Sequence, residues 1–331
     1  MKSDSFMLSL SNVVIAQTSY TRYNFDQITK MESMIIVLIV ILWHLSIISI
    51  MVVGLSSMLI RGVSFIIDML SHFQLQYLVA TFVLLLFGLH MDLATPHFTI
   101  VVFGYLLLQL IILIPFKLSP ASDEFIKNSD IFYINANYQN EDYEDIVKTI
   151  KENDLKTVAV VEAHNRLLGA LKELYGEPIC IKGERGNKNA IFSKRKYRTV
   201  DVELEERTYP ICITKIDDRV LVLIHPYPPM DNDRYKRITD HFKEVREVLN
   251  ELDKCDEKYI LIGDFNSTIF SPIFRRNFKK IFRSNVYSWA VDTVLALPID
   301  HALSNGHIEV ERSKKMSSDH AGLFIKYSSK Q

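Results

Sequence analysis

Polar side chains that can bind a metal ion or transfer a proton recur at the ends of apolar stretches in the second half of the chain. Asp264 and Asn266 follow the apolar run Tyr259 to Ile262 and a break at Gly263. The same placement recurs for a larger group of side chains: Asn135, Glu162, His225, Asp300, His301, Asp319 and His320. Active sites of layered α/β folds collect at strand ends, where loops converge over a rigid sheet. We therefore predict that these side chains meet in one site.

The residue types indicate the chemistry of that site. Carboxylates and amides without clustered cysteines suit a hard cation such as Mg²⁺ or Mn²⁺. A histidine beside a carboxylate can act as a general base or as a hydrogen-bond donor to the transition state. Together these groups can hydrolyse a phosphate ester. The three cysteines, Cys180, Cys212 and Cys255, are too few and too scattered to predict a disulfide framework or a zinc site.

Elements that position these residues follow from the hydrophobic pattern. Strands are predicted at 130–136, 157–162, 190–194, 209–216, 219–225, 259–262, 298–303 and 322–327. Helical spacing of apolar residues occurs near 143–150, at 167–174 and at 238–252. The alternation favours an α/β layered fold with a mixed sheet over a regular parallel barrel.

The first part of the chain has a different composition. Apolar blocks at about 34–60, 77–95 and 98–116 are candidate transmembrane helices, of which the second is marginal in length. The first block is too long for a signal-peptide core and predicts a retained membrane anchor. We expect a tail at 1–33, the anchor at 34–116, a linker at 117–128 and a catalytic domain at 129–331. The alternative is that these blocks are buried helices of a soluble domain.

Charges near the predicted spans set the expected orientation. Lys2, Arg22 and Lys30 precede the first span, and Arg61 follows it. This small excess places the N-terminus inside the cell. With three spans, we predict a multi-pass protein of the cell membrane whose catalytic domain lies outside the cytoplasm.

The charge of the second part restricts the class of substrate. Residues 117–331 contain equal numbers of basic and acidic side chains, so their formal net charge is zero. This argues against a nucleic-acid binder that relies on a broad basic face. Basic side chains gather instead at 182–198, beside Asn189, and at 275–283, which begins with Arg275 and Arg276. Asn189, Arg275 and Arg276 are predicted to contact an anionic substrate; the alternative is an ordinary solvated surface.

An ordered set of motifs carries a resemblance to a known family. NANYQN, VVEAHN, LIHPYPP, GDFNSTIFSPIFRR, PIDHAL and SSDHAG occur in this order. The set resembles the endonuclease/exonuclease/phosphatase superfamily of magnesium-dependent enzymes, over about residues 129–327. HPYPP and GDFNSTIFSPIFR, behind membrane spans, are similar to bacterial membrane-anchored members, including the glycopeptide-resistance proteins. The resemblance implies a four-layer α/β sandwich behind three transmembrane helices.

The resemblance also implies residue roles. Glu162 would be the principal metal ligand, with Asn135 beside it and Asp319 as a further ligand. His225 would bond the phosphoryl group, and Asp264 and Asn266 would position the nucleophile. Asp319 would orient His320, supported by Asp300, and the general base is left open between Asp264 and His320. One departure is Val161, because the family usually has Gln before the glutamate.

These observations predict a membrane-anchored phosphoesterase that uses Mg²⁺ or Mn²⁺. Tethering a hydrolase concentrates it near lipids, which favours a lipid-linked phosphate ester as substrate. One alternative is an anchored nuclease acting on DNA or RNA. Another is an inactive scaffold that retains the fold. No protein partner can be inferred from the sequence.

Overall fold

The computed structural model describes residues 36, 38–55, 65–91, 93–113, 115–116, 119–183, 188–200, 209–278, 281–283, 286–293 and 295–327. The predicted tail at 1–33 lies outside them. The chain divides into two compact units. One consists of residues 1–52 and 80–106, and the other of residues 53–79 and 107–331.

Two helices in the described residues are long and apolar enough to cross a membrane, Leu38–Leu55 and α4 (Pro96–Leu113). A third candidate consists of α2 (Phe65–Ser71) and α3 (Gln74–His90), which are bent by 69° at the break between them. The sequence pattern predicted three spans but did not predict α2.

The larger unit contains two six-stranded sheets. The strands of the first lie in the order β11 (Ile308–Arg312), β12 (Leu323–Tyr327), β1 (Ile131–Asn135), β2 (Thr157–Val161), β4 (Asn189–Ser193) and β3 (Cys180–Lys182). The second has the order β5 (Tyr197–Thr199), β6 (Cys212–Ile216), β7 (Arg219–Ile224), β8 (Lys258–Asp264), β10 (Asp300–Ser304) and β9 (Phe282–Arg283). Each sheet has one parallel pair at its centre, β1 with β2 and β7 with β8.

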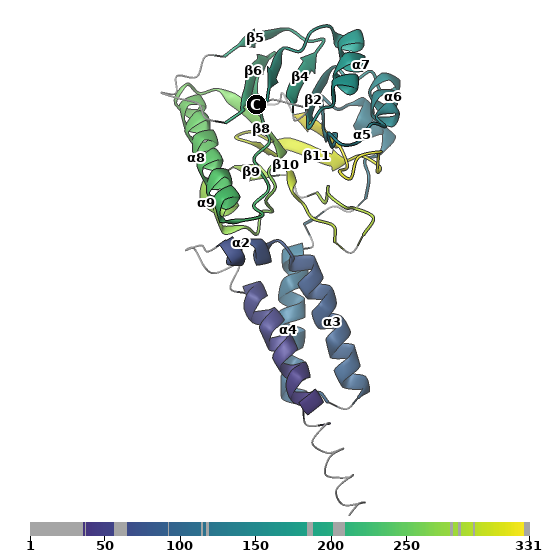
Figure 1. Ribbon diagram of the computed structural model, residues 1–331, viewed down its shortest axis with the longest axis vertical. Helices are drawn as coiled ribbons and strands as arrows, with labels where there is room; N and C mark the ends of the chain where they lie inside the picture. The colour runs from purple at the N-terminus through teal and green to yellow at the C-terminus, as the bar shows by residue number, and fades with distance from the viewer. Residues whose placement is uncertain are drawn as a thin grey trace, which may run out of the picture. The chain divides into compact units, whose positions relative to one another are not determined.

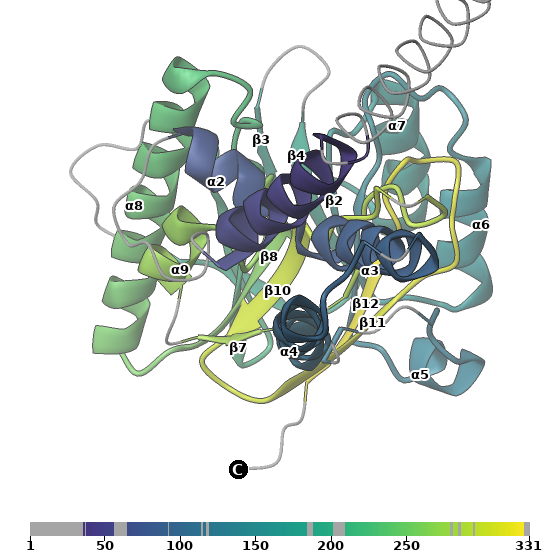
Figure 2. The same ribbon diagram turned by 90° about the horizontal axis from the view of Figure 1, so that it is seen from below.

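Helices cover the outer faces of the two sheets (Figure 1). Helices α6 (Glu144–Glu152) and α7 (Asn165–Tyr175) pack on the first sheet. Helices α8 (Asn232–Lys254) and α9 (Pro272–Phe278) pack on the second. A third apolar cluster fills the space between the sheets. The view in Figure 2 shows α8 and α6 on opposite sides of the strands. The unit is therefore a four-layer α/β sandwich, as the sequence predicted.

Buried residues explain why the central strands form where they do. Every residue of β1, β2, β4 and β7 is buried, which fits the continuous apolar runs expected of strands covered on both faces. The short helix α5 (Asp123–Lys127) begins at Ser122, whose hydroxyl accepts a hydrogen bond from the backbone of Phe125. The edge strands β3, β5, β9 and β11 were not predicted.

Candidate active site

Four of the predicted site residues lie at the carboxyl ends of the strands in the two central parallel pairs, at one end of the sandwich. Asn135 is the last residue of β1, and Glu162 directly follows β2. His225 directly follows β7, and Asp264 is the last residue of β8. The side chain of Asn135 donates a 3.0 Å hydrogen bond to Asp264 Oδ2. This bond joins the ends of the two sheets and brings their polar side chains into one cluster.

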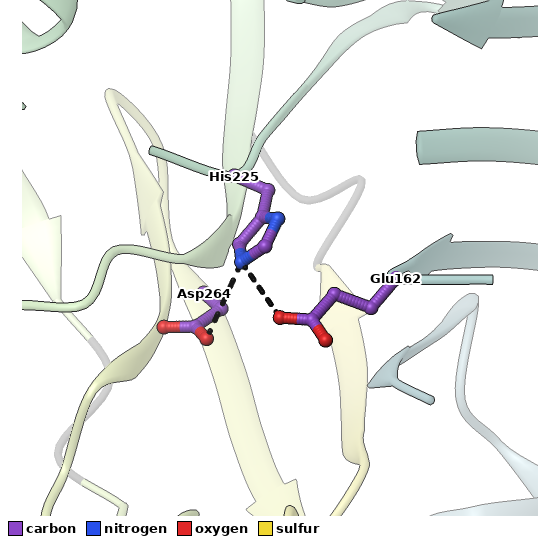
Figure 3. A group of neighbouring side chains, drawn as sticks. All are labelled: Glu162, His225 and Asp264. Carbon is purple, nitrogen blue, oxygen red and sulfur yellow. Dashed lines mark ion pairs between the residues drawn. The ribbon is translucent and has the colours of Figure 1, made fainter. Parts of the chain in front are cut away.

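The ring of His225 lies between the carboxylates of Glu162 and Asp264 (Figure 3), and Glu162 makes several contacts in this cluster. Its Oε1 is 3.1 Å from His225 Nε2 and accepts a 3.4 Å hydrogen bond from Asn135 Nδ2. Its backbone has φ of 50°, a left-handed conformation that costs a residue other than glycine free energy. Burial opposes ionisation, but His225 and Asn135 lower the pKa of Glu162 below its ordinary value. Glu162 is therefore held as a carboxylate.

Val161, the departure from the family pattern, lies in the apolar cluster between the sheets. The side chain therefore contributes to the core and leaves the glutamate without a neighbouring amide at that position. Tyr138 supplies another donor, because its backbone N–H donates a 3.4 Å hydrogen bond to Glu162 Oε2.

Asp264 is almost fully buried at the end of β8. Its Oδ2 is 3.8 Å from both His225 Nε2 and His320 Nε2. Burial and the nearby negative charge of Asp300 raise the pKa of Asp264 to about 6, although both histidines act to lower it. Asp264 and Asp300 are directly opposite on the antiparallel strands β8 and β10, where like charges repel. Positive charge is needed to keep both carboxylates ionised.

His320 supplies one such charge. Its Nδ1 is 2.7 Å from Asp300 Oδ2. Burial opposes the charged form of His320, but the charge of Asp300 and this hydrogen bond raise its pKa to about 10. The other oxygen of Asp300 accepts a 2.7 Å hydrogen bond from the hydroxyl of Tyr133. Burial raises the pKa of that hydroxyl well above its ordinary value, so it remains a donor. The four side chains form one chain of contacts from Tyr133 to Asp264.

Asn266 follows Asp264 in a tight turn. Its backbone N–H donates a 2.7 Å hydrogen bond to Asp264 Oδ1, and its side chain donates a 3.0 Å bond to the backbone oxygen of Pro226. Gly263 pairs with Ile224 across β7 and β8, and a Cβ at this glycine would lie 2.0 Å from the Ile224 oxygen. The glycine therefore allows the close approach of the two strands that carry His225 and Asp264.

The structure places Asp300, rather than Asp319, against the ring of His320. Asp319 was expected to orient His320 and to bind metal. The contact to His320 Nδ1 is made by Asp300, and metal binding by Asp319 stays a prediction. Asp319 is exposed and accepts hydrogen bonds from the side chains of Asn137 and Trp289, each at 3.0 Å. Among the described residues, Asp319 belongs to neither of the two carboxylate and histidine groups that could hold a metal ion.

The predicted substrate contacts are divided between two places. Asn189 is buried at the start of β4, where the strand pairing places it across from the end of β2. It therefore lies at the same sheet edge as Glu162. Arg275 and Arg276 lie on α9, and Arg275 acts electrostatically on Asp68 of α2. His301, which follows Asp300 in β10, contacts the backbone oxygen of Ser267 at 2.8 Å through Nε2.

Sequence reasoning missed Tyr133 as a site residue. It lies inside the apolar run of β1, where a tyrosine resembles any other core aromatic residue. The alternation of β1 offered one signal, because Tyr133 and Asn135 are two residues apart and share a face of the strand. Asn137, with φ of 53°, was also missed, and its backbone N–H donates to Asn135 Oδ1 at 3.0 Å.

The donor set fits a divalent metal ion. Atoms of Glu162, His225 and Asp264 lie within 4.8 Å of one another, and those of Asp264, Asp300 and His320 form a second such group. Three carboxylates converge in a buried place, where uncompensated negative charge is costly. Oxygen ligands are those that hard cations prefer. The fold and this site define an enzyme that hydrolyses phosphate esters with the aid of a metal ion.

Comparison with known families agrees with this class. Residues 132–320, more than half of the chain, match the model of the Endonuclease/Exonuclease/phosphatase family. The chain belongs to this family. A search of curated proteins found no match, so the more specific similarity to bacterial membrane-anchored members stays a prediction.

Solved structures show a distant likeness. The AP endonuclease from Archaeoglobus fulgidus is 13% identical, with a TM-score of 0.49, over 60% of this chain and 98% of its own. Truncated TDP2 from Caenorhabditis elegans is 12% identical, with a TM-score of 0.49, over 60% of this chain and 96% of its own. TDP2 from D. rerio, solved with a single-strand DNA product, is 13% identical, with a TM-score of 0.47, over 59% and 96%.

Proposed function

We propose that the chain is a membrane-anchored phosphoesterase that uses Mg²⁺ or Mn²⁺ and hydrolyses a lipid-linked phosphate ester. The observation that carries the proposal is the cluster of Glu162, Asp264, Asp300 and His320 at the end of the sandwich. Its occurrence in a chain with candidate membrane spans supports a substrate at the membrane. The net charge of zero over residues 117–331 argues against a broad polyanion-binding face.

Each residue has a role in the proposal. Glu162, with Asn135 and Asp264 beside it, would hold the metal ion. The bound metal would neutralise phosphoryl oxygens and lower the pKa of water. His225 is placed to donate a hydrogen bond to the phosphoryl group, and Asn266 positions Asp264 through its backbone N–H.

His320 and Asp264 are the two candidates for the group that accepts a proton from the attacking water. They are 3.8 Å apart and are held by Asp300 and Asn266 respectively. Asn189 supplies a further amide at the same sheet edge. Arg275 and Arg276, on α9, are proposed to attract anionic headgroups rather than to touch the reacting phosphate.

A nuclease is the second candidate, because the family to which the chain belongs includes endonucleases and exonucleases. The experiment that separates the two uses the full chain in phosphatidylcholine vesicles with Mg²⁺. Its substrates are a lipid phosphate, such as phosphatidic acid or a polyprenyl phosphate, a soluble chromogenic ester, and single-stranded DNA and RNA. The proposal predicts that the lipid is cleaved faster than the polynucleotides. Faster cleavage of DNA or RNA, with a strong dependence on salt, would favour the nuclease.

The proposed location has its own test. With the N-terminus inside and three spans, the region after residue 117 faces outward. Protease added to intact spheroplasts should then digest this region without lysis. Protection until lysis would reverse the orientation and would move the substrate to phosphate esters of the cytoplasm.

A further inference from the structure

Helix α2 has its two polar side chains buried and two of its apolar side chains exposed, the reverse of an ordinary surface helix. Asp68 and Ser71 are fully buried, whereas Ile66 and Leu70 are 65% and 37% exposed. Ile66 and Leu70 are four residues apart and share one side of the helix. Asp68 is two residues from each and therefore lies on the opposite side.

The buried side of α2 bonds to the start of α9. Asp68 Oδ1 accepts a 2.7 Å hydrogen bond from the hydroxyl of Ser271 and a 3.4 Å bond from the backbone N–H of Ile273. Ser271 is the residue before α9, and its hydroxyl also accepts a 3.3 Å bond from the backbone N–H of Phe274. Asp68 therefore fixes α2 to the first turn of α9.

A second contact reaches the catalytic loop itself. His72 Nδ1 accepts a 3.2 Å hydrogen bond from the backbone N–H of Thr268 and lies 3.0 Å from the hydroxyl of the same residue. Thr268 is two residues beyond Asn266. The end of α2 is therefore fixed beside the turn that positions Asp264.

Apolar packing strengthens this attachment. The first turns of α3, the end of α4 and the chain directly after it pack on loops of the sandwich in one cluster. It is composed of Leu75, Leu78, Ile112, Leu113, Phe116, Ile269, Phe270, Tyr287, Val291 and Ala296. Phe270 lies in the same loop as Thr268. The segment from α2 to the start of α3 thus belongs to the compact unit that contains the site.

The direction of α2 indicates what its exposed side contacts. Helix α3 begins three residues after Ser71, and α2 is bent from it by 69°. We take α3 alone as the membrane-spanning part of this bent pair. A helix bent by 69° from a span that runs along the membrane normal lies at a low angle to the bilayer surface. Helices that lie in the interface place apolar side chains in the lipid and polar side chains away from it. Ile66 and Leu70 provide such an apolar side.

We propose that α2 lies flat in the bilayer surface, with Ile66 and Leu70 in lipid and its polar side bonded to residues 268–273. This inference rests on the membrane anchoring in the proposed function. It places the turn at Asn266 beside the lipid headgroups, so the substrate is a membrane lipid whose scissile phosphate lies at headgroup level.

Spin labels test the position of α2 directly. Single labels are placed by cysteine substitution at Ile66, at Leu70 and, as a matched control, at Tyr197, which is 58% exposed on β5. The accessible cysteines, Cys180 and Cys255, are first replaced by serine, and the buried Cys212 is kept. The full chain in phosphatidylcholine vesicles is then exposed to oxygen, which concentrates in lipid, and to a water-soluble nickel chelate.

If α2 lies in the lipid, labels at 66 and 70 should collide more with oxygen, and the label at 197 should collide more with the nickel chelate. Equal nickel accessibility at all three positions overturns the proposal. Protection of 66 and 70 from both reagents also overturns it, because protein would then cover α2, and cross-linking would show whether a second copy does so.

Turnover gives a second measurement. Replacing Ile66 and Leu70 together by serine should lower hydrolysis of a lipid phosphate about tenfold. The loss of apolar side chains weakens the attachment of α2 to the bilayer, which lowers the local concentration of lipid substrate at the site. Hydrolysis of a soluble ester should not change, and Tyr197→Ser should change neither rate. Equal loss on both substrates would contradict the proposed position of α2.

The outcomes separate this inference from the proposed function. If the chain hydrolyses lipid phosphate while the labels at 66 and 70 face water, the proposed function is supported and the proposed position of α2 is refuted. If the labels are buried in lipid but the chain cleaves only polynucleotides, the position of α2 is supported and the lipid substrate is refuted.

Discussion

Replacing Tyr133 by phenylalanine removes one hydroxyl from the site and leaves the ring in place. That hydroxyl donates a 2.7 Å hydrogen bond to Asp300, whose other oxygen is 2.7 Å from His320 Nδ1. Tyr133 and Asp300 are fully buried, so bulk water does not replace the lost donor. A hydrogen bond to a charged group contributes about 1.5–3 kcal/mol. We expect the free energy of unfolding to fall by about this amount.

The same substitution should change catalysis through His320. Burial raises the pKa of Asp300, and the charge of His320 and the hydrogen bonds to Asp300, including that of Tyr133, lower it below its ordinary value. Losing the Tyr133 bond raises the pKa of Asp300 and lowers that of His320 from about 10. If about 1.4 kcal/mol of the lost bond acts in the transition state, kcat falls about tenfold. KM should change little, because Tyr133 has no exposed surface.

The assay is kcat and KM for a soluble ester across pH, together with urea unfolding. Tyr235→Phe is the matched control, because its hydroxyl is buried without a hydrogen-bond partner among the described residues. Tyr133→Phe should lower kcat and move to lower pH the limb of the pH profile that His320 governs, and the control should do neither. An unchanged pH profile in Tyr133→Phe would refute this reasoning.

Two further substitutions test the architecture of the site. Gly263→Ala would place a Cβ 2.0 Å from the oxygen of Ile224; we expect a loss of about 1–3 kcal/mol in urea unfolding, and wild-type stability would contradict the close strand approach. In the metal-free protein, Asp300 raises the pKa of His320 to about 10 against the effect of burial. Protonated His320 therefore stabilises the folded state. This contribution is complete below the unfolded-state pKa of about 6.5 and is lost as the pH rises to about 10. His320→Gln should remove this decline between pH 6.5 and 10, and an equally steep decline in the variant would show that another group causes it.

The central strands could be predicted because their burial requires an apolar sequence. Most of the site could be predicted because its polar residues lie at the ends of these strands. β1, β2, β7 and β8 are mostly apolar, and each ends in, or is directly followed by, a polar side chain of the site. Short edge strands could not be predicted, because they are partly exposed. β5, for example, is exposed throughout, so the core imposes no pattern on its sequence.

Helix α2 was missed for a different reason. Its seven residues are too few for a periodic signal, and its buried Asp68 and exposed Ile66 reverse the pattern on which helix prediction relies. Asp319 was expected to orient His320, to which it is adjacent in sequence. Strand pairing places Asp300 opposite Asp264 instead, and a contact set by sheet register is not visible in local spacing.

Binding of Mn²⁺ to the full chain, followed together with ester hydrolysis, tests the central claim most directly. The wild type is compared with Glu162→Gln, which keeps the shape of the side chain and removes its charge. We predict that the wild type binds Mn²⁺ and loses activity on chelation, and that Glu162→Gln binds the ion at least tenfold more weakly and is at least 100-fold slower, as expected for loss of a metal ligand. Wild-type binding and turnover in Glu162→Gln would contradict a metal-dependent site at the end of this sandwich.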